Sequence, residues 1–549
     1  EYEIKRELLP AFVSRVTADS LLFIGRSLNH IQSRRSSNAK LPELEILPSH
    51  LQQISSLKFP INSTNFSRVV SSIRLSLSQK ILTCLLPLAR VNLILSLLRE
   101  IFLLGRGEFA VALVTEGDER MRSRWRQAQN SNFEHRDGTA DIFLKEGELS
   151  VVLTKTWATL SALQGQIEEY QEDDEILELA RDLVRLTTSK SPVVASHLRN
   201  PSMELGSKIL STPFKNLLFS IPTSLTMHIP SPLDLFLTPS DIQIYSCINA
   251  YLLSIRRAHL RLTDLWKVTA MRRHHPATRS PSQRNFATNE LMIQERRQKI
   301  NQRFLAMRSV WATSSAALFF LAETETYFQG EVVQGLWAGF KNWIHGEPGS
   351  PTESRPGSRT NEDNGINNSP PPTRMSTNIS LEDRQTHDPQ SLTDAHQKYL
   401  SALAYSLLLT NPEFTNLIYQ FLQQIDHLVA LVHRIHSIWQ SLDLEAYEGV
   451  VDAFSDFHQE ERDIRQQLRV VAAGVKAIIE KLIQSLREID QDKHGWDNGF
   501  VPLALADENQ FVPAKVGRVD RLLMKLDFGG WFASQKQDFD DLSNKSDDE

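Results

Sequence analysis

The stretch from Tyr251 to His275 constrains the fold most, because its apolar residues recur at the spacing of an α-helix. They follow one another at intervals of three, four and seven residues, and they are Ile248, Leu252, Ile255, Leu262 and Trp266. A second face of the same helix carries Arg257, Arg261 and Asp264. This pattern predicts an amphipathic helix that packs inside a bundle of helices.

The residues before this stretch predict where the helix begins. Thr238 is suited to cap a helix N-terminus, Pro239 to occupy the first helical position, and Asp241 to lie in the first turn. The preceding segment, Pro230–Pro239, is predicted to be extended, because proline disfavours helix in the residue before it.

Most other apolar stretches also have a helical period, and strand-like alternation is short and scarce, so we predict an all-α class. Residues 167–190 are predicted to be acidic and then helical, 189–226 to be irregular, and 290–330 to be a helix with Phe304 on its apolar side. Residues 346–391 contain almost no large apolar side chain. They cannot bury enough surface to offset the entropy of ordering, which predicts a disordered insert.

Composition narrows the class of protein. The 549 residues carry a net charge of −6, so no global basic excess points to nucleic acid. Only two cysteines occur, Cys84 and Cys247, which argues against a disulfide framework. The apolar stretch Ile81–Leu104 contains three charged residues, so we interpret it as a buried core helix and expect no membrane insertion.

Local catalytic motifs are absent from the sequence. It has no Gly-x-x-x-x-Gly-Lys phosphate loop, no Cys-x-x-Cys pair and no Gly-x-Ser-x-Gly elbow. His433 and His436 have helical spacing, but no second ligand pair accompanies them. We therefore expect no enzyme activity, no metal and no cofactor, while a catalytic site assembled from distant residues stays open as an alternative.

Six segments carry recognisable motifs, and they are Tyr2–Ile31, Ile101–Glu108, Pro232–Pro239, the helix motif Leu252–Arg257 with Leu262 to Trp266, Leu392–Leu400 and Leu522–Phe528. Taken in this order, they resemble motifs of the gamma-tubulin complex components, the grip-domain proteins. The resemblance implies an elongated array of helical bundles with disordered inserts. It also implies the end of a first grip domain at 1–130 and a second grip domain at 131–345 and 392–535, interrupted by the insert at 346–391 and followed by an acidic tail at 536–549.

The same resemblance implies a function. The chain is expected to be a non-catalytic scaffold of the gamma-tubulin ring complex that binds gamma-tubulin and other complex components. It would template microtubule nucleation at microtubule-organising centres and spindle poles, in the cytoplasm and cytoskeleton, without nucleic acid, membrane insertion or a cofactor.

Eleven residues are our candidates for contact with gamma-tubulin: Pro232, Leu233, Thr238, Pro239, Arg256, Arg257, Arg261, His396, Tyr399, Asp527 and Phe528. For each, internal packing or a helix cap is the competing interpretation. Three other functions stay open: an unrelated helical rod that tethers or assembles proteins, an enzyme with a dispersed site, and nucleic-acid binding by the basic region 272–308.

Overall fold

The computed structural model describes residues 8–10, 12–34, 43–57, 61–78, 87–131, 146–164, 171–188, 213–219, 222–230, 232–268, 286–345, 389–448, 456–491, 511–514 and 519–527. Helices make up nearly all of these residues, which confirms the predicted all-α class. Most of the predicted insert and the predicted acidic tail lie outside the described residues. Helix α14 begins at Pro389, within the last three residues assigned to that insert.

The longer helices are α1 (Arg15–Arg34), α2 (Glu43–Ser55), α3 (Ser63–Leu77), α5 (Leu88–Leu97), α6 (Gly107–Ser131), α7 (Glu146–Gln164), α8 (Gln171–Leu183), α10 (Pro239–Asp264), α12 (Phe286–Thr326), α13 (Gln334–Ile344), α14 (Pro389–Ser406), α15 (Pro412–Glu448), α16 (Phe457–Gln491) and α18 (Asp520–Asp527). Two π-helices continue neighbouring α-helices: η3 (Leu98–Phe102) follows α5, and η7 (Tyr327–Val333) follows α12.

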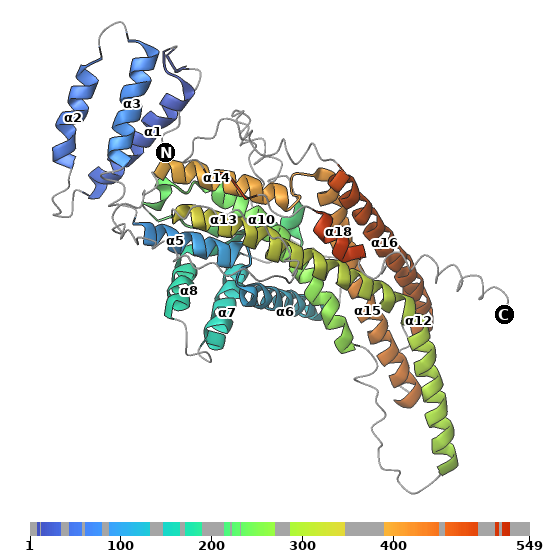
Figure 1. Ribbon diagram of the computed structural model, residues 1–549. Helices are drawn as coiled ribbons and strands as arrows, with labels where there is room; N and C mark the ends of the chain where they lie inside the picture. Colours follow the sequence, from blue (N-terminus) through green and yellow to red (C-terminus); the bar gives the residue numbers. More distant parts are fainter. Residues whose placement is uncertain are drawn as a thin grey trace, which may run out of the picture.

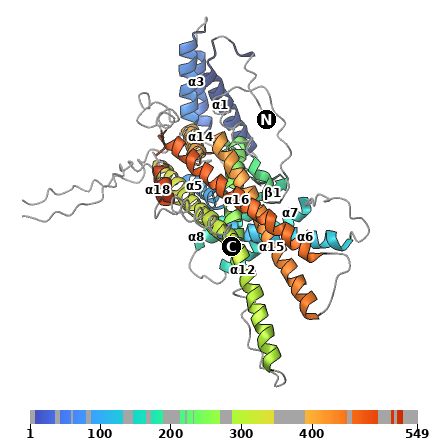
Figure 2. The same cartoon turned by 90° about the vertical axis from the view of Figure 1, so that its right-hand side faces the viewer.

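The elements form an elongated molecule with three parts (Figure 1). In the middle, α10 lies among α5, α13 and α14, with α6, α7 and α8 on one side. The small bundle α1–α3 lies at one end, and the long helices α12, α15 and α16 extend toward the other. Figure 2 shows the same separation from the side, with α1 and α3 at the top and α12 reaching furthest down.

Helix α10 begins as the sequence predicts. The Thr238 hydroxyl accepts a hydrogen bond from the Asp241 N–H at 3.3 Å, and the Asp241 carboxylate accepts one from the Thr238 N–H at 2.9 Å. Pro239 occupies the first turn, where its missing N–H costs nothing. This reciprocal cap orients a helix that is buried on almost every side, because α6, α12, α14, α15 and a small sheet all pack against it.

Two aromatic side chains depart from the predicted apolar faces. Trp266 is 52% exposed, since α10 ends at Asp264 and the chain tightens into the 3₁₀ turn η6 (Leu265–Val268), which moves it off the buried stripe. Phe304 is also exposed, at 56%, on α12. The other stripe residues of α10 are buried as predicted: Ile248, Leu252, Ile255 and Leu262.

Three local predictions were wrong: helix up to residue 190, irregular structure throughout 189–226, and an extended segment at Pro230–Pro239. Residues 184–188 form strand β1 (Val184–Thr188), which pairs antiparallel with β2 (Thr223–Met227), so Val184 lies opposite Met227 and Thr188 opposite Thr223. Neither strand has enough residues for its alternation to stand out in the sequence. Leu233–Leu235 forms the 3₁₀ turn η5, because the carbonyl groups of Pro230 and Pro232 accept N–H bonds from residues three positions later.

The described part of the apolar stretch Ile81–Leu104 is a core segment, as predicted. From Leu88 onward, α5 and η3 bury residues such as Val91, Ile94 and Phe102. One described helical stretch, Arg297–Ile344, is long and apolar enough to cross a membrane, and 39% of its most apolar window is buried. It packs against α10, α16 and α18, and core helices share this property, so it is weak support for a membrane span.

Candidate functional site

The first group of predicted residues meets where α10 begins beside α14. His396 lies between the Tyr245 hydroxyl, at 3.0 Å from Nε2, and the Asp241 carboxylate, at 3.9 Å from Nδ1. Burial lowers the pKa of His396, and the distant carboxylate only partly opposes that effect. Burial thus favours the neutral imidazole of His396, which joins two helices through its hydrogen bond with Tyr245.

The neighbours of His396 are equally enclosed. Tyr399 is fully buried and stacks on Phe340 at 4.9 Å between ring centroids. Leu233 is fully buried, and Pro232 is buried beside it. Thr238 is half-buried, and Pro239 is exposed. Among the predicted contact residues described at this end of α10, Pro239 and part of Thr238 offer surface to a partner protein.

The second group lies in the last third of α10 and forms a charge network. Asp118 on α6 accepts from Arg257 Nε at 3.3 Å and from Arg261 Nη2 at 2.8 Å. Asp426 on α15 accepts from Arg257 Nη1 at 3.0 Å and from Arg261 Nη1 at 2.6 Å. Two arginines and two aspartates thus connect three helices, and Arg257 also donates to the carbonyl of Leu217.

This network gives Arg257 and Arg261, two of the predicted contact residues, ion-pair partners inside the chain. Burial alone would raise the pKa of Asp118, but the hydrogen bonds and charges of Arg261 and Arg257 outweigh it and hold that pKa below its usual value. The same carboxylates raise the pKa of Arg261. Arg257 is only 7% exposed. Arg257 and Arg261 thus form ion pairs within the chain. Their partners lie on other helices, α6 and α15, which the spacing of residues along α10 cannot predict.

Arg256 points to another side of α10. Its Nη1 lies 2.8 Å from Glu325 Oε1, and His259 Nδ1 lies 2.7 Å from the second oxygen of the same carboxylate. The Arg256 side chain is 28% exposed. It therefore remains within reach of solvent while Glu325 on α12 holds it in place.

Arg256 lines an open pocket of about 380 Å³. The opposite wall comes from η3 and the loop after it, with Arg99, Gly105 and Gly107, and the remaining wall from the α12–η7–α13 run, with Glu325 and Gln334. Pockets of this size suit small ligands or single peptide side chains. The sequence motif Ile101–Glu108, singled out for its family resemblance, supplies much of one wall.

The backbone around this pocket has three uncommon features. Both η3 and η7 are π-helices, a rare form that often occurs at functional sites. Leu104 has φ of 57°, in the left-handed region that a non-glycine residue seldom adopts. Gly105 admits no side chain easily, since a Cβ there would lie 3.1 Å from the Arg99 carbonyl oxygen. This concentration of unusual geometry marks the pocket as a candidate site.

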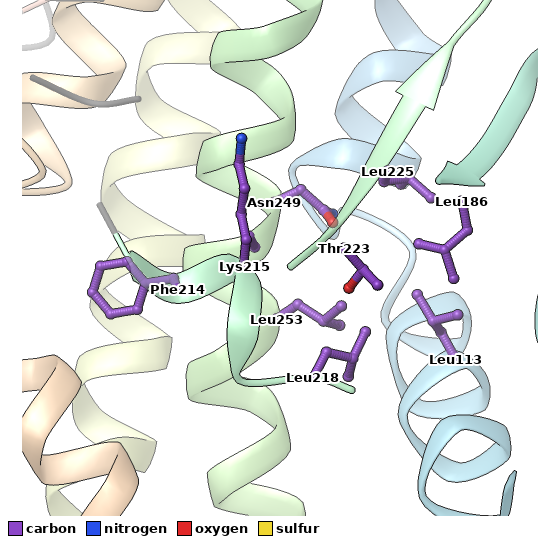
Figure 3. Close-up of a pocket in the computed structure, with 10 residues that line it drawn as sticks. Leu113, Leu186, Phe214, Lys215, Leu218, Thr223, Leu225, Asn249 and Leu253 are labelled. Carbon is purple, nitrogen blue, oxygen red and sulfur yellow. The ribbon is translucent and has the colours of Figure 1, made fainter. Parts of the chain in front are cut away.

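A second cavity lies against the small sheet (Figure 3). It is enclosed and holds about 20 Å³, with Leu113, Leu186, Leu225 and Asn249 among its lining residues. That volume fits about one water molecule. We interpret it as a packing defect beside α10 and not as a ligand site.

The last predicted residues lie at the far end of the chain. Asp527 on α18 is 52% exposed at its side chain and lies 3.2 Å from Arg487 Nη2 on α16. Phe528 is outside the described residues. No contact given among the described residues joins Asp527 to the two groups on α10, so the structure does not assemble the predicted residues into one surface.

Comparison with known proteins decides the family. Residues 93–532 match the family model described as "Gamma tubulin complex component C-terminal". The chain belongs to the gamma-tubulin complex component family. The match spans α10, α12 and α14 to α18 and begins after the bundle α1–α3.

Three members of the family show how far their sequences differ from this chain. Gamma-tubulin complex component 4 of Homo sapiens and that of Mus musculus are each 22% identical over 288 residues, which are 50% of this chain and 37% of the relative. The gamma-tubulin complex component 4 homolog of Medicago truncatula is 27% identical over 114 residues, or 21% of this chain and 14% of the relative. The aligned part of the chain thus spans little more than a third of the mammalian relatives' length.

Proposed function

We propose that this chain is a structural component of a gamma-tubulin complex that binds gamma-tubulin and contributes to templating microtubule nucleation at microtubule-organising centres and spindle poles. The observation that carries the proposal is the family match over residues 93–532. Other components of the complex are its further proposed partners, and the cytoskeleton is its proposed location. Catalysis in this proposal belongs to the assembled template and requires no active site in the chain.

The packing of the central region supports such a role. A scaffold accelerates assembly when it holds its partners in the productive geometry before they meet, because the entropy of ordering is then spent in advance. Helix α10 is buried by its neighbours, and the Asp118–Arg257–Arg261–Asp426 network connects α6, α10 and α15. A partner bound to this frame would keep a constant position relative to it.

Exposure divides the candidate contacts with gamma-tubulin into two classes. Pro239, Arg256 and Asp527 have surface to offer, and we propose them as direct contacts. Leu233, His396, Tyr399 and Arg257 are buried, and we propose that they position the surface without touching the partner. Arg261 belongs with the second class because both of its ion-pair partners lie within the chain.

The test is capture of purified gamma-tubulin by the purified chain, followed by size-exclusion chromatography. We expect the two proteins to elute together. Asp527→Lys is expected to weaken capture about three- to tenfold, roughly the effect of one interfacial charge. Arg26→Glu, on the exposed side of α1 outside the family match, is the matched control and should leave capture unchanged. A folded chain that never elutes with gamma-tubulin would overturn the proposal.

A further inference from the structure

We propose that the 380 Å³ pocket between η3, α10 and η7 binds a carboxylate side chain of an acidic peptide segment on a partner protein. Asp527 and Pro239 do not line this pocket. Arg256 does, but the inference does not depend on gamma-tubulin binding. It rests on the hydrogen-bonding capacity, the charge and the preorganisation of the pocket wall.

The hydrogen-bonding capacity of the wall favours an acceptor as ligand. Glu325 already receives one bond on each carboxylate oxygen, from Arg256 at 2.8 Å and His259 at 2.7 Å. The Gln334 side-chain oxygen already receives one from Arg99 Nη2 at 2.6 Å. Each guanidinium carries five N–H donors, more than these bonds use. Two arginines on opposite walls thus retain donors for an incoming oxygen.

Charge selects among the ligands that offer such oxygens. Arg99 and Arg256 supply two positive charges to the lining, and Glu325 supplies one negative charge. A lining with an excess of one positive charge suits a ligand with one negative charge better than a doubly charged phosphate. Apolar lining side chains, Leu104 and Val333 among them, can contact the methylene groups of a glutamate. These features together favour a peptide carboxylate.

The donors are also held in place before a ligand arrives. The Arg99 guanidinium lies 5.7 Å from the ring centroid of Trp337 and is bonded to Gln334. Gln329 Nε2 donates to the Leu103 carbonyl at 3.1 Å, which ties η7 to the loop before Gly105. The close backbone approach at Gly105 keeps this loop against η3. A wall built in advance loses little conformational entropy on binding.

The experiment measures fluorescence anisotropy of a labelled hexaglutamate peptide with the purified chain at physiological salt. Hexaglutamine and inorganic phosphate are the comparison probes. We expect saturable binding of hexaglutamate, no binding of hexaglutamine, and no displacement by phosphate at equal concentration. Binding of phosphate in preference to the peptide would overturn the assignment to a peptide carboxylate.

Variants locate the binding. Arg256→Gln and Arg99→Gln should each weaken hexaglutamate binding about tenfold, the effect of losing one charge-assisted hydrogen bond. Arg487→Gln removes an equivalent charge from α16 and is expected to change nothing. An equal loss with Arg487→Gln would show that the peptide binds basic surface in general and would overturn the proposal.

Glu325→Gln separates ligand binding from structural damage. It breaks the same ion pair as Arg256→Gln but frees the arginine for the peptide, so hexaglutamate should bind more tightly. A protein that merely depends on the Arg256–Glu325 pair for its fold would bind more weakly in both variants, and that result would contradict the proposal. Arg99→Gln changes no proposed gamma-tubulin contact, so its capture of gamma-tubulin should equal that of the wild type, and failure of either proposal can be recognised separately.

Discussion

The bundle α1–α3 and the centre around α10 differ in the kinds of side chain that they bury. Of the seventeen exposed large apolar side chains among the described residues, eight lie between Leu8 and Leu75. Within the same bundle the buried side chains include as many hydroxyl groups as apolar ones: Thr17, Ser20, Ser27 and Ser78 beside Ala18, Val70, Ile73 and Leu77. The centre, by contrast, buries large aromatic residues such as Tyr245, Tyr251 and Phe340.

This difference implies unequal stability. One contact between helices α1 and α3 is a hydroxyl bond between Thr17 and Ser67, at 2.9 Å, and a typical hydrogen bond contributes only about 1 kcal/mol net. Burying one large apolar side chain contributes about 1.5–3 kcal/mol. The N-terminal bundle should therefore unfold first, and the centre, which is more stable, should unfold last. The family match begins at residue 93, after this bundle.

The largest expected effect comes from Phe340→Ala in the centre. Phe340 is fully buried and contacts the rings of His396, Tyr399 and Phe511. Truncating it should lower the free energy of unfolding by about 3–5 kcal/mol, because lost transfer energy and a new cavity add together. Urea unfolding followed by circular dichroism measures the change. Phe304→Ala, on the exposed side of α12, is the control and should stay within about 0.5 kcal/mol.

The second prediction tests the charge network beside α10. Asp118→Ala leaves Arg257 and Arg261 short of a partner and should cost about 3 kcal/mol, as breaking a buried ion pair does. Asp527→Ala, at the exposed pair with Arg487, should cost at most about 1 kcal/mol. Equal costs for the two variants would mean that the network adds nothing beyond a surface pair.

The pH dependence of the network follows from the pKa of Asp118. That pKa is lower in the folded protein than the value of about 3.9 expected in the unfolded chain. The stability contributed by Asp118 is then present above about pH 4 and is lost as the pH falls through the folded-state pKa. Wild type should therefore lose stability in acid more steeply than Asp118→Ala, and parallel curves of unfolding free energy against pH would contradict this assignment.

A small effect on stability is expected in the N-terminal bundle. Leu47, Leu51 and Ile54 lie at helical spacing on one face of α2, and each is more than half exposed. Changing all three to serine should alter the free energy of unfolding by less than about 1.5 kcal/mol, since surface changes cost at most about 0.5 kcal/mol each. Binding of a hydrophobic dye should fall at the same time. A loss as large as that of Phe340→Ala would remove the contrast between the two regions.

Much of the fold could be predicted because it depends on neighbouring residues. The cap of α10 involves Thr238, Pro239 and Asp241, which lie within four positions of one another. The helical spacing of Ile248, Leu252 and Ile255 predicted their burial. The two strands and η5 were missed since each is at most five residues long and its pairing or turn depends on context.

Sequence alone thus determined the all-α class, the start of the central helix and the family motifs, because each of these depends on residues a few positions apart. Tertiary structure decided what the charged residues do. Arg257 and Arg261 have helical spacing typical of a free basic face, but their partners Asp118 and Asp426 are more than a hundred positions away. The pocket beside Arg256 likewise exists only where η3 and η7 meet. Side chains brought together by folding leave no local pattern, so only the packed chain separates internal ion pairs from available surface.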